Sequence, residues 1–197
     1  MSDIHYFPRY SHPENVVTNN TLLLLLRLRE YSRFKFEKFM EKLCAGADEE
    51  VQLAGSWLRF QQQKGTGQSV VDGFIGQDSL KIAVETKLGD AFDAAQLENH
   101  LAVFGDEQHK LLILLSRSHD EAADSQLRAV RELAKQRNIQ VVSTSFEKIV
   151  REARDCLSPH DEEMTALVDD YEAFCSDQEL LPKDKYTMFV PPAARSH

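Results

Sequence analysis

Three charged side chains stand inside two apolar stretches near the middle of the chain, and their spacing could support metal-dependent chemistry. Asp72 lies within the run Val70–Ile75, and Glu85 and Lys87 lie within Leu80–Leu88. A charged group inside an apolar strand is costly to bury unless it is paired or binds a metal. Because side chains alternate along a strand, Glu85 and Lys87 project from the same face.

The turn between these two stretches is expected to bring Asp72 to that face. Residues 76–79, Gly-Gln-Asp-Ser, have the composition of a tight hairpin. With a symmetric turn about residues 77–78, Asp72 is predicted opposite Ala83 and diagonal to Glu85. Two carboxylates and an ammonium would then converge. Magnesium prefers such carboxylate ligands together with waters and substrate phosphate, and the ammonium could orient the attacking water or stabilise charge on phosphorus.

Structural interpretations of the same residues stay open. Glu85 and Lys87 could form an ion pair within a solvated strand face, because the pattern E-x-K is common in half-exposed strands. Asp72 could belong to an Asp-Gly turn. The apolar residues on both sides of Asp72 favour a strand at this position.

Two helical segments offer further polar side chains. A helix that starts near Asp90 would place Gln96 and His100 four residues apart on one face, which could equally be a plain exposed face. Glu14 follows Pro13 in the first turn of a long helix. An acid at this position is also favoured by the helix dipole alone.

The hydrophobic period changes repeatedly along the chain between the helical and the strand pattern. Helices are predicted over residues 14–43 with a break near 31–33, over 90–104, 121–136, 146–156 and 162–175, and strands over 56–63, 69–75, 80–88, 110–116 and 139–143, with a last extended segment at 186–190. The first three strands form an antiparallel meander, and the last lies parallel to its predecessor through a right-handed crossover. The fold class is therefore α/β, with a mixed central sheet flanked by helices.

Composition places these elements in three regions. An N-terminal arm covers residues 1–13, a core covers 14–156, and an acidic helical extension covers 157–197. The net charge is −9, and the segment 155–197 carries ten acidic but only three basic residues. The first 154 residues are thus close to neutral, so a surface that faces phosphates remains compatible with the sequence.

No segment has the length and composition of a membrane span. The longest apolar run, Leu22–Leu26, is followed at once by Arg27, and a cytoplasmic protein is expected. The cysteines, Cys44, Cys156 and Cys175, are odd in number and far apart, so reduced and mostly buried thiols are predicted.

The order of the elements and the D…E-x-K pattern resemble the PD-(D/E)xK nuclease superfamily, which has the restriction-endonuclease-like fold. The resemblance covers residues 14–145. It implies that Asp72 and Glu85 bind the metal, that Lys87 attends the attacking water, and that Glu14 adds a metal or water contact.

Two further positions compare with the same superfamily. Gln96 matches the glutamine that many members carry on the helix after the E-x-K strand. Val71 is a departure, because the motif has a proline directly before the aspartate.

The resemblance also implies a function. It is the hydrolysis of nucleic-acid phosphodiester bonds, with DNA favoured over RNA, Mg²⁺ as cofactor, Mn²⁺ as its substitute, and a role in bacterial defence or repair. Arg27, Lys64 and His100 are candidate contacts with the nucleic acid. A homodimer or a protein partner is expected to use the acidic C-terminal region, and no membrane is expected. The alternatives are a catalytically silent binding or assembly module with the same fold and an RNA-directed nuclease.

Overall fold

The computed structural model describes residues 13–45, 58–65, 70–77, 79–89, 92–117 and 127–182. The helices are α1 (Pro13–Tyr31), α2 (Arg33–Leu43), α3 (Ala94–His100), α5 (Arg128–Gln136), α6 (Phe146–Asp155) and α7 (Glu162–Asp177), and a short 3₁₀ turn, η1 (Leu101–Val103), follows α3. The strands are β1 (Arg59–Gly65), β2 (Val70–Gln77), β3 (Leu80–Lys87), β4 (His109–Ser116) and β5 (Gln140–Ser145).

The five strands form one mixed sheet in the order β1-β2-β3-β4-β5. The pairs β1–β2 and β2–β3 are antiparallel, and the pairs β3–β4 and β4–β5 are parallel. The predicted α/β class, with a meander followed by a parallel crossover, is therefore confirmed. The predicted extended segment 186–190 and the start of the predicted helix 121–136 lie outside the described residues.

The register of the β2–β3 hairpin differs from the prediction by two residues. Gln77 pairs with Leu80 and Phe74 pairs with Ala83, so the predicted position of Asp72 opposite Ala83 is wrong. The difference arises because Gly76 lies within the strand and not in the turn. A Cβ atom at Gly76 would come within 2.9 Å of the Leu80 carbonyl oxygen, and glycine permits this close approach of the two backbones.

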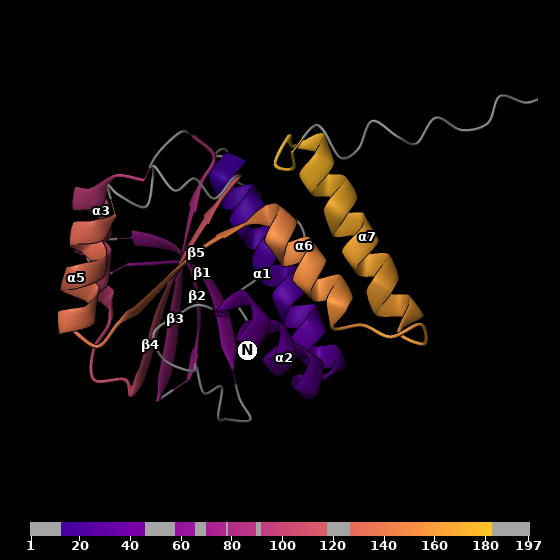
Figure 1. Cartoon of the computed structure of the whole chain (residues 1–197), viewed down its shortest axis with the longest axis horizontal. Helices are drawn as coiled ribbons and strands as arrows, with labels where there is room; N and C mark the ends of the chain where they lie inside the picture. Colours follow the sequence, from indigo (N-terminus) through magenta and orange to yellow (C-terminus); the bar gives the residue numbers. More distant parts are fainter. Residues whose placement is uncertain are drawn as a thin grey trace, which may run out of the picture.

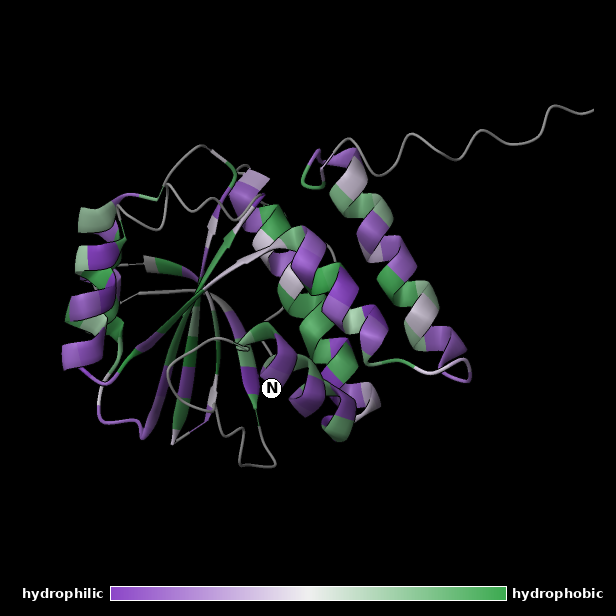
Figure 2. Ribbon diagram, in the orientation of Figure 1, coloured by the Kyte–Doolittle hydropathy of each residue, from purple (hydrophilic) through white to green (hydrophobic). Residues whose placement is uncertain are grey.

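Two hydrophobic clusters cover the two faces of the sheet. The larger cluster joins α1, α2, α6 and α7 to one face, and the smaller joins α3 and α5 to the other. Figure 1 shows α7 as the outermost helix, beside α1 and α6. Figure 2 shows hydrophobic residues along the strands and α1, and both hydrophobic and hydrophilic residues along α5 and α7. Helix α7 contributes Met164, Val168, Tyr171 and Cys175 to the larger cluster, so it packs as part of the core.

The predicted break in the first helical segment is confirmed at Ser32, between α1 and α2. The Ser32 backbone is extended, and its hydroxyl accepts a hydrogen bond from the backbone N–H of Lys35, which caps α2. The new helix direction buries Phe36 and Phe39, and the Phe36 ring meets the Phe60 ring of β1 edge to face.

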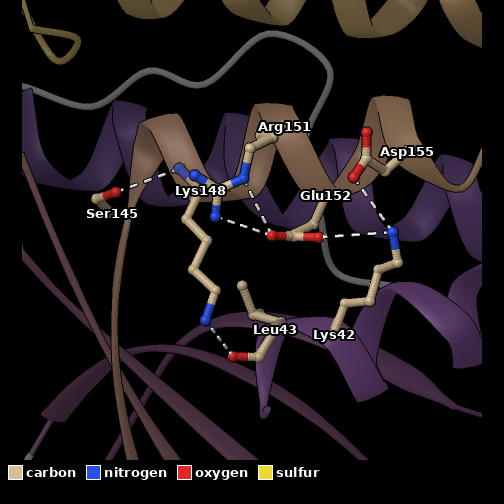
Figure 3. A network of polar contacts seen from close by, with 7 residues as sticks. All are labelled: Lys42, Leu43, Ser145, Lys148, Arg151, Glu152 and Asp155. Carbon is tan, nitrogen blue, oxygen red and sulfur yellow. Dashed lines mark hydrogen bonds and ion pairs between the residues drawn. The ribbon is translucent and has the colours of Figure 1, made fainter. Parts of the chain in front are cut away.

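A polar network fastens α2 to α6 (Figure 3). Lys42 Nζ lies 3.3 Å from Asp155 Oδ2 and 3.8 Å from Glu152 Oε2, and Arg151 donates to the other Glu152 oxygen. Lys148 Nζ donates to the Leu43 carbonyl at the end of α2. These contacts tie α2 to α6 within the helical layer.

The remaining predictions about the fold concern the cysteines and the membrane. Cys44, Cys156 and Cys175 are buried free thiols, as predicted. Among the described residues, no helix combines the length and the apolar character needed to span a bilayer.

Candidate active site

Glu85 and Lys87 lie at the end of β3, and both project from the face of the sheet that α3 covers. Glu85 is almost fully buried, whereas the side chain of Lys87 is 36% exposed. The backbone register explains the pattern, because Ala83 belongs to the smaller hydrophobic cluster and residues 85 and 87 continue its side of the strand. Lys87 pairs in register with Ser116 of β4, so the site lies where β3 and β4 end.

Asp72 reaches this strand end from β2. The β2–β3 ladder ends at the pair Gly73 and Val84, one residue before Asp72 and Glu85 would face each other. The Asp72 carboxylate replaces the missing ladder bond, since its Oδ2 accepts the backbone N–H of Thr86 at 2.9 Å. Asp72 is therefore a strand residue beside Glu85 and not part of a turn.

Burial and neighbouring acids change the pKa of Asp72. Burial raises the pKa of Asp72 to about 7, and the nearby charges of Glu85 and Glu14 act in the same direction. The hydrogen bond from Thr86 and the proximity of His100 oppose the shift. An acid whose pKa is raised by burial and by a neighbouring carboxylate is typical of functional sites.

Two side chains of helix α3 contact the carboxylate of Glu85. Gln96 Nε2 donates to Glu85 Oε1 at 3.0 Å, and His100 Nε2 lies 3.1 Å from Glu85 Oε2. The two side chains share one helix face because they are four residues apart. Asp93 caps α3 through the N–H groups of Ala95 and Gln96, which fixes where the helix begins.

The first turn of α1 reaches the same strand end. Glu14 Oε1 accepts the backbone N–H of Leu88 at 3.2 Å and lies 3.7 Å from Lys87 Nζ. Thr18 is one turn further along α1, and its hydroxyl forms a hydrogen bond of 2.7 Å with the hydroxyl of Thr86. Glu14 thus makes specific contacts beyond the general attraction of an acid to a helix N-terminus.

The structure brings together five of the predicted residues around Glu85. The carboxylate partner of Lys87 is Glu14, so the alternative of a simple Glu85–Lys87 pair does not describe the contacts. Gln96 is exposed as a residue but bonds Glu85 through its amide. His100 is only 2% exposed and faces Glu85, which favours positioning of that carboxylate over direct contact with a nucleic acid.

Of the two other predicted nucleic-acid contacts, Arg27 lies apart from this cluster, whereas the backbone of Lys64 lies beside the residue that precedes Asp72. Arg27 pairs with Glu30 on an exposed turn of α1, and it follows Glu14 by thirteen residues, or about 20 Å of helix. Lys64 pairs through its backbone with Val71, and its side chain lies outside the described part of the structure.

Sequence reasoning missed the two threonines that join α1 to β3. Thr86 presents its backbone to Asp72 and its hydroxyl to Thr18, and Thr18 also donates to the Glu14 carbonyl. The available signals were the position of Thr86 between Glu85 and Lys87 and the four-residue spacing of Thr18 from Glu14. Neither signal indicates a contact between segments that lie 68 residues apart.

Asp72 and Glu85 fit a divalent cation only as a two-carboxylate site. Within the described residues, no three carboxylate, imidazole or thiol groups come together in a way that would hold a metal ion. Mg²⁺ commonly uses one or two protein carboxylates and takes its other ligands from water and substrate. Within the described residues, Glu85 Oε2 is a buried oxygen that makes no hydrogen bond, although His100 Nε2 lies 3.1 Å from it. A cation there would also offset the carboxylate repulsion that, together with burial, raises the pKa of Asp72.

The chain was compared with models of protein families, with curated proteins and with solved structures, and none of them matches it.

Proposed function

We propose that this protein is a metal-dependent phosphodiesterase of the PD-(D/E)xK type that hydrolyses the backbone of nucleic acids, with DNA favoured over RNA. One observation carries the proposal: Asp72, Glu85 and Lys87 meet at one strand end, and Glu14 and Gln96 reach them from two different helices. These are the residues that the resemblance assigned to the reaction.

Each side chain has a role that follows from its contacts. Asp72 and Glu85 would hold Mg²⁺, with Mn²⁺ as a substitute, and the bound ion would lower the pKa of a water and polarise the phosphate. Lys87 is the exposed cation of the site, and its ammonium can orient the nucleophile or stabilise charge that develops on phosphorus. Glu14 positions this ammonium, and Gln96 and His100 position the Glu85 carboxylate.

The second candidate is a nuclease-like fold that binds or assembles without turnover. The net charge of −9 favours it, because a polyanion is repelled by most of such a surface. The buried carboxylates argue for the enzyme, since burying Glu85 and Asp72 side by side costs stability.

Cleavage assays separate the two candidates. Supercoiled plasmid, single-stranded DNA and a structured RNA would each be incubated with the purified protein and Mg²⁺, Mn²⁺ or EDTA. We expect metal-dependent cleavage that is lost in Glu85→Ala and in Lys87→Ala and retained in Glu98→Ala. Glu98 is a matched control, because it is an exposed acid on α3. The polymer that is cut identifies the substrate.

Calorimetric titration with Mn²⁺ supplies a readout that does not depend on turnover. Binding that is present in the wild type and absent in Asp72→Ala supports the metal site even without cleavage. If neither cleavage nor metal binding occurs with any of these ions, the nuclease proposal is wrong and the assembly module is favoured.

A further inference from the structure

Helix α5 differs from the other helical surfaces in how its positive charges are used. Six basic residues of α1, α2 and α6 form ion pairs with carboxylates. They are Arg27, Arg33, Lys35, Lys42, Arg151 and Arg154. These helices therefore present a surface whose charges are largely neutralised.

Three exposed basic residues lie on α5 or directly after it. Arg128 and Lys135 lie two turns apart on the helix, and Arg137 follows its last turn. Within the described residues, no carboxylate lies at ion-pair distance from any of these three side chains. Glu132 is the single acid among residues 127–140.

Contacts with the sheet hold this helix in place, and a cation of β4 adds to its positive potential. Arg131 donates to the Val141 carbonyl and to the Ser143 hydroxyl of β5. Lys110, at the start of β4, donates to the Arg137 carbonyl. Burial of Val130 and Ala134 and the bonds of Arg131 fix the helix on the sheet, so its charges are held in place.

The order of the strands places the N-terminal end of α5 on the side of the candidate active site. β4 ends at Ser116 beside Lys87, and β5 starts beside Leu111 near the other end of β4. Helix α5 connects these two strands, so it runs antiparallel to β4. Its N-terminal residue, Arg128, therefore lies towards the end of the sheet at which β3 ends. Helix α5 covers the same face as α3, which carries Gln96 and His100 (Figure 1).

We propose that the exposed face of α5, defined by Arg128, Lys135 and Arg137, is the surface that binds the phosphate backbone of the nucleic acid and directs it to the strand ends. The proposal rests on the proposed nuclease function for the identity of the occupant. Its independent support is charge complementarity, since this face is basic on a protein of net charge −9.

Binding assays without catalysis test the surface directly. The triple variant Arg128→Gln, Lys135→Gln, Arg137→Gln would be compared with the control triple Arg33→Gln, Lys38→Gln, Arg151→Gln, which has the same change of net charge. Arg33, Lys38 and Arg151 are likewise exposed and lie on α2 and α6. Fluorescence anisotropy of a labelled DNA duplex, a labelled DNA single strand and a labelled RNA duplex would be measured in EDTA at several KCl concentrations.

We expect the α5 triple to bind at least tenfold more weakly at low salt. The slope of log K against log salt concentration should also decrease by about 2 to 3 for duplex DNA, because three phosphate contacts are lost. The control triple should change the slope by less than about 1. Equal losses in both triples, an unchanged α5 triple, or absence of binding by the wild type to all three polymers would overturn the proposal.

The same proteins distinguish this proposal from the nuclease proposal. If the wild type binds nucleic acid through α5 but shows no metal-dependent cleavage, the proposed binding surface is supported and the nuclease proposal is refuted. If cleavage depends on metal and kcat/KM is unchanged in the α5 triple variant, the proposed binding surface is refuted and the nuclease proposal is supported.

Discussion

His100 Nε2 lies 3.1 Å from Glu85 Oε2, and both side chains are buried. Gln96 holds the other oxygen of the same carboxylate. One short helix therefore restrains Glu85 from two positions. Partners of this kind orient a metal ligand before the metal arrives, and their loss typically lowers metal affinity.

The first prediction concerns His100 as a positioning residue. We expect His100→Ala to bind Mn²⁺ about 10- to 100-fold more weakly than the wild type. His100→Gln retains an N–H donor and should recover part of this loss. Calorimetric titration measures the affinities, and thermal unfolding of the metal-free proteins shows whether stability changes in parallel. A role limited to packing would lower the Tm of His100→Ala and leave its metal affinity unchanged at temperatures where it is folded.

The second prediction concerns the pH dependence of stability without metal. The pKa of Asp72 is about 7 in the folded protein and has its ordinary value of 3.8 in the unfolded chain. Between these values the folded state binds more protons, so the contribution of Asp72 to the free energy of unfolding decreases as the pH rises from about 4 to 7. Each pKa unit corresponds to about 1.4 kcal/mol.

Asp72→Asn removes this dependence and keeps an oxygen that can accept the Thr86 N–H. Urea unfolding in EDTA should therefore show that the variant gains stability relative to the wild type as the pH rises towards 7. A stability difference that is the same at pH 5 and pH 8 would contradict the assigned pKa. Saturating Mg²⁺ should reduce the trend, because a bound cation favours the ionised carboxylate.

The parts of the site that follow from periodicity could be predicted from the sequence. Alternation along β3 places Glu85 and Lys87 on one face, and helical spacing places Gln96 and His100 on one face of α3. Both patterns are local, so they need no knowledge of the tertiary fold. The choice between an exposed face and a contact with Glu85 depends on where α3 packs, and this information is not local.

The errors and omissions come from register and long-range packing. A turn centred on residues 77–78 is plausible from composition, but the close backbone approach at Gly76 moves the turn towards Ser79. The acidic C-terminal region remains a predicted partner surface, but one of its acids is used within the fold. Asp161 accepts hydrogen bonds from Tyr31 and Ser158 and pairs with Lys35. Charge patterns in a sequence do not tell which acids are used within the fold.

The third prediction uses the end of α7. Glu179 has φ 55°, a left-handed conformation that strains a residue with a Cβ atom. Its backbone N–H donates to the Ser176 carbonyl, and that of Leu180 donates to the Cys175 carbonyl, which is the pattern of a helix end that favours glycine. Glu179→Gly should stabilise the protein by about 1 kcal/mol. Gln178→Gly is the control, because Gln178 has φ −86° and should gain nothing. A lower urea midpoint for Glu179→Gly than for the wild type would contradict the assignment.

The fourth prediction concerns the contact between α1 and β2 beneath the candidate site. A Cβ atom at Gly73 would lie 2.8 Å from Leu22 Cδ1 and 3.3 Å from Thr18 Cγ2, and Leu22 is fully buried. Gly73→Ala should therefore destabilise the protein by about 1 to 3 kcal/mol, because the buried Leu22 side chain, or α1 with it, must move away from β2. Thr18 bonds both Thr86 and the Glu14 carbonyl, so a movement of α1 would also displace the Glu14 carboxylate from the strand end.

Two measurements separate the structural effect of Gly73→Ala from its effect on the site. Urea unfolding gives the loss of stability, and the rate of plasmid cleavage at a temperature where the variant is folded gives the effect on the site. Gly105→Ala is the control, because its new Cβ atom would meet only the Glu107 carboxylate at an ordinary distance of 3.7 Å. We expect Gly73→Ala to lower both stability and cleavage, and Gly105→Ala to lower neither by a comparable amount. Wild-type stability for Gly73→Ala would show that α1 does not pack against β2 as tightly as the structure indicates.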